Sequence, residues 1–393
     1  MLPGMHSGRF IFAQLLDHLS RYEFNQCVSR HEGNRRIRTF SCWDQFLVML
    51  FAQLTYRESL RDIESCLRAM PRQLYHLGIR GVISRSTLAD ANENRSWRIW
   101  ADFASVLIAH TRRLHAGEPV AGRLKAAVYV FDTTTIDLCL TLFPWAKFRR
   151  RKSAVKLHTL LDLRGNIPCF VNVSEGSVHE VNVLDELALE AGAYYIMDRG
   201  FVDFARLHRF TLEQAFFVIR SKDNLDFRVI ESRPVDRDRG LRADQTIKVR
   251  GPLSRKRYPS PLRRVSFVDV ATDKRFVFLT NNFTLAASTF PKLYKSRWQV
   301  ELFFKWIKQY LRIKTFFGTS PNAVKTQVWT AISAYVLVMI ARRELKLEQP
   351  MGEILQVMSL TLFEKPPVFQ VFSRGAREIA DAENHKPLSL FDF

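Results

Sequence analysis

Two short apolar runs that each lead directly into an aspartate constrain the fold of this chain more than any other feature. Residues 126–131 are apolar and are followed by Asp132, and residues 193–197 are apolar and are followed by Asp198. Short apolar runs bounded by polar residues are typical of buried strands. We expect each aspartate to end its strand, where its carboxylate leaves the core at the edge of a sheet.

The segments around these two runs alternate between strand-like and helix-like patterns. Gly165 and Asn166 join two strand-like runs in the manner of a hairpin turn. The order β, β, β, α, β, α, β predicts an α/β fold with a mixed sheet. The strand-like runs lie at 126–131, 156–163, 167–173, 193–197 and 216–219, and the helix-like runs lie at 184–190 and 204–212.

The first 116 residues have the periodicity of short helices. Ser41 followed by Asp44 is the pattern of a capping box before an apolar run, and Thr55 followed by Glu58 repeats that pattern. Short helices with basic residues between them are compatible with a helical DNA-binding unit. A small packing domain has the same pattern, so both interpretations stay open here.

Turn-forming residues and changes in charge predict how the chain divides. Gly117, Pro119 and Gly122 mark a linker. Residues 220–264 contain 14 Lys or Arg against 6 Asp or Glu, so we expect a basic insertion, mostly of strands, that contacts nucleic acid. The predicted divisions are a helical N-terminal region at 1–116, an α/β domain at 122–345 with its β-rich insertion at 220–285, and a helical tail at 346–393.

The overall charge predicts the class of partner. Lys and Arg number 59 against 39 Asp and Glu, which gives a formal net charge of +20 and a pI of about 10.0. An excess of this size argues for an anionic partner, and nucleic acid is the usual one. The charge of a single basic segment is also compatible with a solvated surface loop.

Several classes of protein are not expected. The longest apolar runs are shorter than the ~20 residues that a membrane span needs, and the N-terminus lacks the pattern of a signal peptide. The five cysteines are scattered, with no Cys-x-x-Cys pair, which argues against both a disulfide framework and a cysteine zinc site. We expect a cytoplasmic protein with reduced cysteines.

Residues 294–314 are predicted to form one amphipathic helix with a polar face. At 100° per residue, Tyr294, Arg297, Glu301 and Lys308 fall within ~60° of arc, beside an apolar stripe. The helix would therefore pack its stripe on a core and present a carboxylate flanked by two cations and a phenol. A charged solvent-facing surface is the alternative for this face taken alone.

The two aspartates that follow strands and the glutamate on the predicted helix could form one metal site. Asp132, Asp198 and Glu301 together would offer the hard oxygen ligands that Mg²⁺ prefers. Two such ions ~4 Å apart can stabilise both the attacking and the leaving oxygen of a phosphodiester displacement. Combined with the +20 charge, the pattern favours a metal-dependent enzyme that acts on nucleic acid.

The series Tyr294-x2-Arg297-x3-Glu301-x6-Lys308 resembles the Tyr-Arg-Glu-Lys signature of bacterial insertion-sequence DDE transposases, in the family typified by insertion sequence four. The strands that lead to Asp132 and Asp198 are similar to the first and second catalytic regions of that family. The helical N-terminus also resembles members of the family, so the likeness covers nearly the whole chain.

The resemblance implies a ribonuclease-H-like fold with a β-rich insertion between the second aspartate and the glutamate, as at 220–285. It implies that Asp132, Asp198 and Glu301 are the catalytic residues and hold two Mg²⁺ (or Mn²⁺) ions. In some relatives a Trp of the insertion stacks on a flipped base, but residues 220–285 contain no Trp.

The resemblance also implies a reaction and its partners. Tyr294, Arg297 and Lys308 would contact DNA phosphates near the cleaved end. The reaction would be cut-and-paste transposition of double-stranded DNA by a homodimer on paired transposon ends, in the bacterial cytoplasm at the nucleoid. The alternatives are a ribonuclease-H-like nuclease without strand transfer and a catalytically inactive DNA-binding descendant.

Basic residues near the two aspartates are further candidates for DNA contact. Arg199 follows Asp198 directly and could grip phosphate or orient the aspartate. A dense basic run after the first aspartate strand would contact the DNA backbone, although a solvated loop is the alternative. The candidates from this run are Arg149, Arg150, Arg151 and Lys152.

Overall fold

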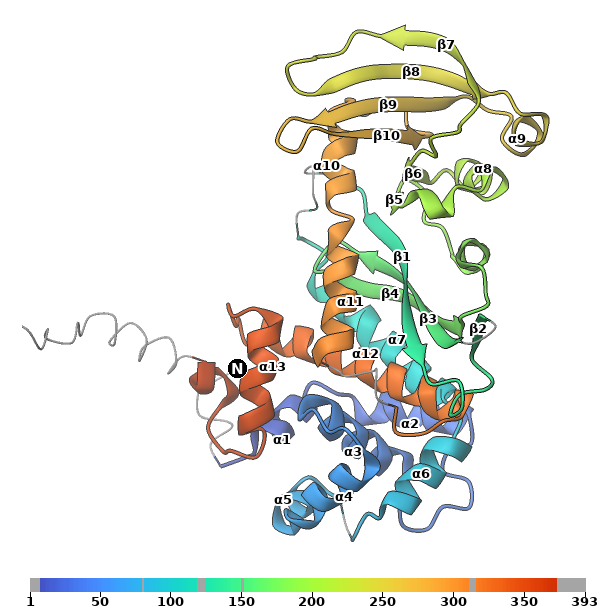
Figure 1. Ribbon diagram of the computed structural model, residues 1–393. Helices are drawn as coiled ribbons and strands as arrows, with labels where there is room; N and C mark the ends of the chain where they lie inside the picture. The colour runs from blue at the N-terminus through green and yellow to red at the C-terminus, as the bar shows by residue number, and fades with distance from the viewer. Residues whose placement is uncertain are drawn as a thin grey trace, which may run out of the picture. The chain divides into compact units, whose positions relative to one another are not determined.

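In the computed structural model the chain forms two units, one of residues 1–114 with 306–393 and one of residues 115–305 (Figure 1). The structure describes residues 8–79, 81–118, 120, 124–149, 152–310 and 316–372. The first unit is helical, and the second contains the described strands. Each unit is described by itself below.

The helical unit is built around one long buried helix, α12 (Pro321–Glu344), which packs against α3, α6, α7 and α13. Nearly all residues from Ala323 to Ala341 are buried, so the helix must be covered on all sides. The other described helices of this unit are α1 (Ile11–Leu16), α2 (Arg21–Arg30), α3 (Cys42–Leu54), α4 (Leu60–Arg68), α5 (Pro71–His76), α6 (Arg85–Asn94), α7 (Arg98–Leu114) and α13 (Met351–Thr361).

This packing divides the chain differently from the predicted boundaries at 116, 122 and 345. The predicted α/β domain included α12, but its partners are helices of the N-terminal region and of the C-terminal tail. By length and composition α12 could also cross a membrane, and 94% of its apolar window is buried inside the protein. Burial on every side explains why its sequence has so weak a polar face.

The start signals of the helices are confirmed in part. Ser41 and Asp44 form the predicted capping box at α3, with both reciprocal hydrogen bonds. The signal at Thr55 is wrong, because Thr55 ends α3 and the next helix begins after Ser59, whose side chain accepts from the Asp62 backbone.

The second unit contains the mixed α/β sheet predicted from the sequence. Three antiparallel strands, β4, β3 and β1, are followed by β5 and β6, which run parallel to β1, and this is a ribonuclease-H-like sheet. The strands are β1 (Val128–Leu138), β2 (Lys147–Arg149), β3 (Lys152–Asp162), β4 (Ile167–Glu175), β5 (Tyr194–Met197) and β6 (Phe216–Arg220). Gly165 and Asn166 both have positive φ and form the predicted hairpin turn between β3 and β4.

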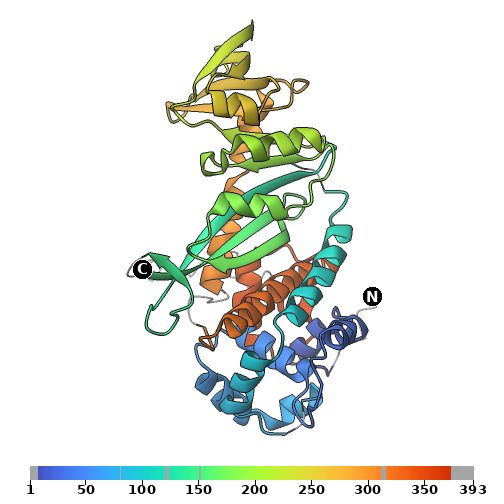
Figure 2. The same cartoon turned by 90° about the vertical axis from the view of Figure 1, so that its right-hand side faces the viewer.

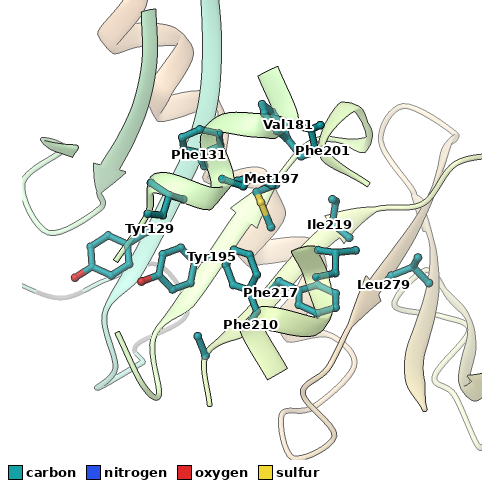
Figure 3. Packing of buried hydrophobic residues seen from close by; sticks show 14 of the residues in the cluster. Tyr129, Phe131, Val181, Tyr195, Met197, Phe201, Phe210, Phe217, Ile219 and Leu279 are labelled. Carbon is teal, nitrogen blue, oxygen red and sulfur yellow. The ribbon is translucent and has the colours of Figure 1, made fainter. Parts of the chain in front are cut away.

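Residues at odd positions of β1, β5 and β6 face one core (Figure 3). Phe131, Tyr195, Met197, Phe217 and Ile219 converge there with the apolar residues of α8. Helix α8 (Phe204–Leu212) and the 3₁₀ segment η2 (Glu180–Glu186) cover this face, and Figure 2 shows them in front of the strands. The helix expected at 184–190 is instead η2 and an extended stretch. Side chains alternate along a strand, so the even positions face the opposite side.

The strand before the first aspartate is longer than predicted. Asp132 does not end β1, because the strand continues to Leu138 by pairing with β3 alone. Pairing with β5 stops at Val130. The β-branched residues from Thr133 to Ile136 favour the extended conformation past this point. Asp132 therefore lies where β1 leaves its parallel neighbour.

The predicted β-rich insertion forms four antiparallel strands that extend the sheet from β6. Strand β10 pairs with β6, and β9, β8 and β7 follow in order. The buried side chains of Arg263 and Asp244 join β9 to β8 with two hydrogen bonds of 2.8 and 2.7 Å. The elements are β7 (Phe227–Arg233), β8 (Leu241–Val249), α9 (Pro252–Arg257), β9 (Leu262–Asp269) and β10 (Lys274–Thr280).

Candidate active site

The register of the parallel strands brings three charged residues to one level. Val130 pairs with Ile196, and Ile196 pairs with Val218. Two residues further along each strand stand Asp132, Asp198 and Arg220. All three occupy even positions, so they lie on the face of the sheet opposite the α8 core.

Helix α10 (Thr289–Lys295) packs against β5 and β6, and Figures 1 and 2 place it on the side of these strands opposite α8. The predicted single helix is wrong, because α10 ends before Ser296 and α11 (Trp298–Tyr310) begins after Arg297. At the break the Arg297 amide donates to the carbonyl of Tyr294, three residues earlier. In such a 3₁₀ turn residues i and i+3 eclipse, so Tyr294 and Arg297 project to the same side.

Two hydrogen bonds connect this turn to the two aspartates. The Tyr294 hydroxyl donates to Asp198 Oδ1 at 2.7 Å. Arg297 Nη1 donates to Asp132 Oδ2 at 2.7 Å, and Nη2 of the same guanidinium donates to Glu301 Oε1. The structure therefore brings together five of the residues predicted from the sequence, with Arg297 between two carboxylates.

The two aspartates differ in electrostatics. Burial raises the pKa of Asp132 to about 6, against the lowering effects of the Thr133 amide and of Arg297. Burial acts in the same direction on Asp198, but the hydrogen bond from Tyr294 and the charges of Arg297 and Arg220 outweigh it and lower its pKa. Asp132 is thus the carboxylate whose charge is less well compensated.

A buried polar network supports Asp132 from the neighbouring strand. The Thr133 amide donates to Asp132 Oδ1, and the Thr133 hydroxyl is 2.8 Å from His158 Nδ1. His158 is fully buried, and its Nε2 is 2.8 Å from the Ser174 hydroxyl. Burial and the charge of Lys156 lower the pKa of His158 to about 4, so its ring is neutral at pH 7. His158 is therefore a structural hydrogen-bonding residue here.

The carboxylates suit Mg²⁺ or Mn²⁺ in kind, since both ions prefer oxygen ligands. Burial disfavours the ionised form of Asp132 and raises its pKa, and a bound cation would stabilise that form. Within the described ranges, no three His, Cys, Asp or Glu side chains are already gathered around one point. The Arg297 guanidinium bridges Asp132 and Glu301, so an ion held by both would have to replace it.

The other predicted contact residues are not gathered at this point. Lys308 is half-buried on α11 seven residues after Glu301, beyond the unit boundary that follows Lys305. Arg199 is half-exposed, with Asp223 at 3.5 Å. Arg149 and Lys152 are exposed, and Lys152 precedes Thr159, the partner of Asp132, by seven residues, ~24 Å along β3. Arg150 and Arg151 lie outside the described residues.

Sequence reasoning missed Arg220 as a candidate for this site. Arg220 ends β6 as Asp198 follows β5, and its position directly after the apolar run 216–219 was a signal of the same kind. Trp298, the first residue of α11, is 48% exposed.

The sequence of this chain is similar to those of known transposases. The family model described as "Transposase DDE domain" matches residues 123–337, and one described as "Domain of unknown function (DUF4372)" matches residues 7–80. A protein named as the transposase y4zB, from Sinorhizobium fredii, is 31% identical over 77% of this chain and 81% of its own length. A transposase named for insertion sequence element IS5377, from Geobacillus stearothermophilus, is 33% identical over 55% of this chain and 57% of its own.

A more distant relative and a solved structure were also found. A transposase named for insertion sequence element IS4SA, from Synechocystis, is 22% identical over 72% of this chain and 78% of its own length. The piggyBac transposase in a synaptic complex with hairpin DNA superimposes with a TM-score of 0.45 at 11% identity, over 98% of this chain and 87% of that one. The family match and the 31% identity show that this chain belongs to the insertion-sequence transposases with a DDE domain.

Proposed function

We propose that this protein cleaves DNA at the ends of an insertion sequence and transfers the freed strand into target DNA by a cut-and-paste route. One observation carries the proposal. Asp132 and Asp198 lie at matching positions of neighbouring parallel strands, and residues of the turn between α10 and α11 donate a hydrogen bond to each of them. Water first attacks a phosphodiester and leaves a 3′-hydroxyl and a 5′-phosphate. The 3′-hydroxyl then attacks a phosphodiester of the target and displaces the 3′-oxygen of the target strand.

Asp132, Asp198 and Glu301 are the proposed catalytic residues and ligands of two Mg²⁺ or Mn²⁺ ions. When bound, the ions would stabilise charge on the attacking and leaving oxygens. Asp132 and Asp198 are held on rigid strands, whereas Glu301 is 57% exposed on α11 and is held by Arg297. Glu301 is thus the ligand with the most freedom to reorient.

Tyr294, Arg297, Glu301 and Lys308 form the proposed Tyr-Arg-Glu-Lys signature. Arg297 suits a bidentate grip on a phosphate once it leaves its carboxylates. The hydrogen bond from Tyr294 to Asp198 lowers the pKa of that carboxyl. Lys308 adds a positive charge about two helical turns further along.

Further DNA contacts are proposed for the basic residues outside this centre. Arg199 would hold a phosphate beside Asp198, and Arg149, Arg150, Arg151 and Lys152 would hold the backbone at a distance from it. The helical N-terminal region would bind the transposon ends. We propose a homodimer on paired ends, working in the bacterial cytoplasm at the nucleoid.

A cleavage and joining assay tests the proposal. A plasmid that carries the element between its own genomic ends is incubated with the protein and Mg²⁺. Asp132→Asn, Asp198→Asn and Glu301→Gln should each abolish cleavage and retain DNA binding. Asp137→Asn is the matched control, since Asp137 lies on the same strand as Asp132 and is exposed.

The outcomes separate the alternatives. Excision and joined product from the wild type and the control alone would support the transposase. Cleavage without joining would identify a nuclease on the same fold. DNA binding without cleavage by the wild type would indicate a catalytically inactive descendant. Normal cleavage by one of the three variants would show that this residue is not catalytic.

A further inference from the structure

A cavity of about 330 Å³ lies where the β-rich insertion joins the sheet of the second unit. The chain segment that leaves β6 forms one wall, and β9 and β10 form another. Four cationic side chains line it, together with Ser221, Asp223 and a few apolar residues. The cations are Arg220, Lys222, Arg264 and Arg275.

Among the described residues that line the cavity, four are cationic and one, Asp223, is acidic, so the lining has a net positive charge. None of the four cations forms an ion pair with a carboxylate of the described residues. Asp223, the acidic residue of the lining, is 92% exposed, and Arg199 lies 3.5 Å from it. Burial and the nearby charge of Arg275 lower the pKa of Arg264, which shows that the two guanidinium groups repel each other. An anion between them would relieve this repulsion.

The cavity adjoins the candidate active site through Arg220 and β10. Arg220 lines the cavity, and its charge also acts on Asp198 and on Tyr294. On β10, Phe278 packs against the Tyr294 ring at 5.0 Å, whereas Val277 and Arg275 line the cavity. Strand β10 therefore lies between the cavity and Tyr294.

Guanidinium groups already lie over one face of Phe227, which lines the cavity, and over one face of Phe276, on the other side of β10. The Arg264 guanidinium lies over the Phe227 ring at 5.0 Å, and that of Arg220 lies over Phe276 at 5.4 Å. A nucleobase would need a free ring face for stacking. The guanidinium groups still offer donors that suit phosphate oxygens. The chemistry of the lining thus favours a phosphate over a base, and the volume is at the small end for a ligand site.

We propose that this cavity binds a backbone phosphate of the DNA strand whose neighbouring phosphodiester reaches Asp198, with Arg264 and Arg275 as its principal ligands. The identification of the bound phosphate as part of a DNA strand depends on the proposed function. The strand would cross the carboxyl end of β6 at Arg220 and continue along the insertion. The insertion would then hold the DNA beside the cleavage point without reading its sequence.

The test combines two probes and matched variants. Inorganic phosphate is titrated by calorimetry at constant ionic strength, and a duplex of the element's own end is bound at several salt concentrations. Arg275→Glu is the main variant because Arg275 is exposed, and Arg264→Gln is the second. Arg228→Glu is the control, since Arg228 is exposed on β7 and does not line the cavity.

We expect Arg275→Glu and Arg264→Gln to lose phosphate binding while the control retains it. Both should bind the duplex about tenfold more weakly at physiological salt, with the slope of log K against log salt reduced by about 1. Thermal melting of each variant identifies a folding defect. If the melting temperature of Arg264→Gln is lower than that of the wild type, the conclusion is drawn from Arg275→Glu.

Other outcomes overturn the proposal in distinguishable ways. If both variants bind DNA and phosphate as tightly as the wild type does, the phosphate site is wrong. If the same variants also cleave DNA, the proposed function is unaffected. Phosphate binding that depends on Arg264 and Arg275 in a protein that binds no DNA would instead identify a site for free phosphate. The proposed function would then have failed together with the DNA occupant.

Discussion

The Tyr294 hydroxyl lies 2.7 Å from Asp198 Oδ1 and donates a hydrogen bond to it, although 96 positions separate the two residues. Burial and the adjacent Asp198 charge raise the pKa of Tyr294 well above its ordinary range, so the phenol stays a donor at any working pH. The bond ties α10 to the carboxyl end of β5 and keeps the pKa of Asp198 low.

Tyr294→Phe is expected to raise the pKa of Asp198. The change removes a hydrogen bond that lowers this pKa, so more of the carboxyl is protonated in acid. Hydrogen bonds to charged groups contribute about 1.5–3 kcal/mol. Carbon-13 NMR titration of the Asp198 carboxyl, without metal or DNA, measures the shift separately from Asp132, whose pKa of about 6 dominates the acidic limb of cleavage. Tyr129→Phe is the control, because that hydroxyl donates to Glu190 on the other face, and an Asp198 titration equal to that of the wild type would contradict the prediction.

Arg297→Gln is expected to bind Mn²⁺ more tightly than the wild type while cleaving DNA more slowly. The guanidinium lies between Asp132 and Glu301, so it competes with a cation for both carboxylates. It is also the group proposed to grip phosphate. Calorimetric titration of Mn²⁺ without DNA measures the first effect, with Arg149→Gln as control. Weaker Mn²⁺ binding by Arg297→Gln would show that the guanidinium supports the site instead.

The stability of the wild type is expected to fall in weak acid because of His158. Its pKa is about 4 in the folded chain against about 6.5 when unfolded. The unfolded state therefore binds more protons between these values, and stability is lost as the pH falls through this window. The expected loss from pH 7.5 to pH 5 is about 2 kcal/mol. Urea unfolding at both pH values measures it, and His158→Gln should remove this part of the pH dependence.

Asp244→Ala is expected to destabilise the insertion by about 3–5 kcal/mol, because it leaves the buried Arg263 without its carboxylate. Arg263 also donates to the carbonyl of Leu285, in the loop before α10. The double variant Asp244→Leu, Arg263→Met should recover much of the loss, since buried ion pairs are often replaceable by apolar groups. Chemical denaturation compares the three proteins. Equal stability of the single and double variants would contradict this reasoning.

Some residues of the candidate active site could be predicted from the sequence because their positions follow from local patterns. Asp132 and Asp198 follow short apolar runs, and alternation along a strand decides the side on which they lie. Glu301 and Arg297 were found from helical spacing, although the helix is broken between Tyr294 and Glu301. The 3₁₀ turn at the break kept Tyr294 and Arg297 on one side, so the error in the helix did not change the grouping.

Other errors have a common cause in tertiary packing. The end of β1 was placed too early because a partner on one side, β3, carries the strand beyond the end of β5. The domain division missed that α12 packs with the N-terminal helices, because a helix buried on all sides has no polar face to indicate its neighbours. The basic run was expected near the site because it is close in sequence, but β3 carries Lys152 away from Asp132.

The sequence by itself determined the class of fold, the two strands that carry aspartates and the helical segment that carries the glutamate. These follow from local periodicity, which each segment has whatever its neighbours are. Only the tertiary structure decided that Arg220 stands level with Asp198 and that Arg297 bridges Asp132 and Glu301. Strand register and contacts between residues far apart in the chain depend on how whole elements pack, so no local pattern contains them.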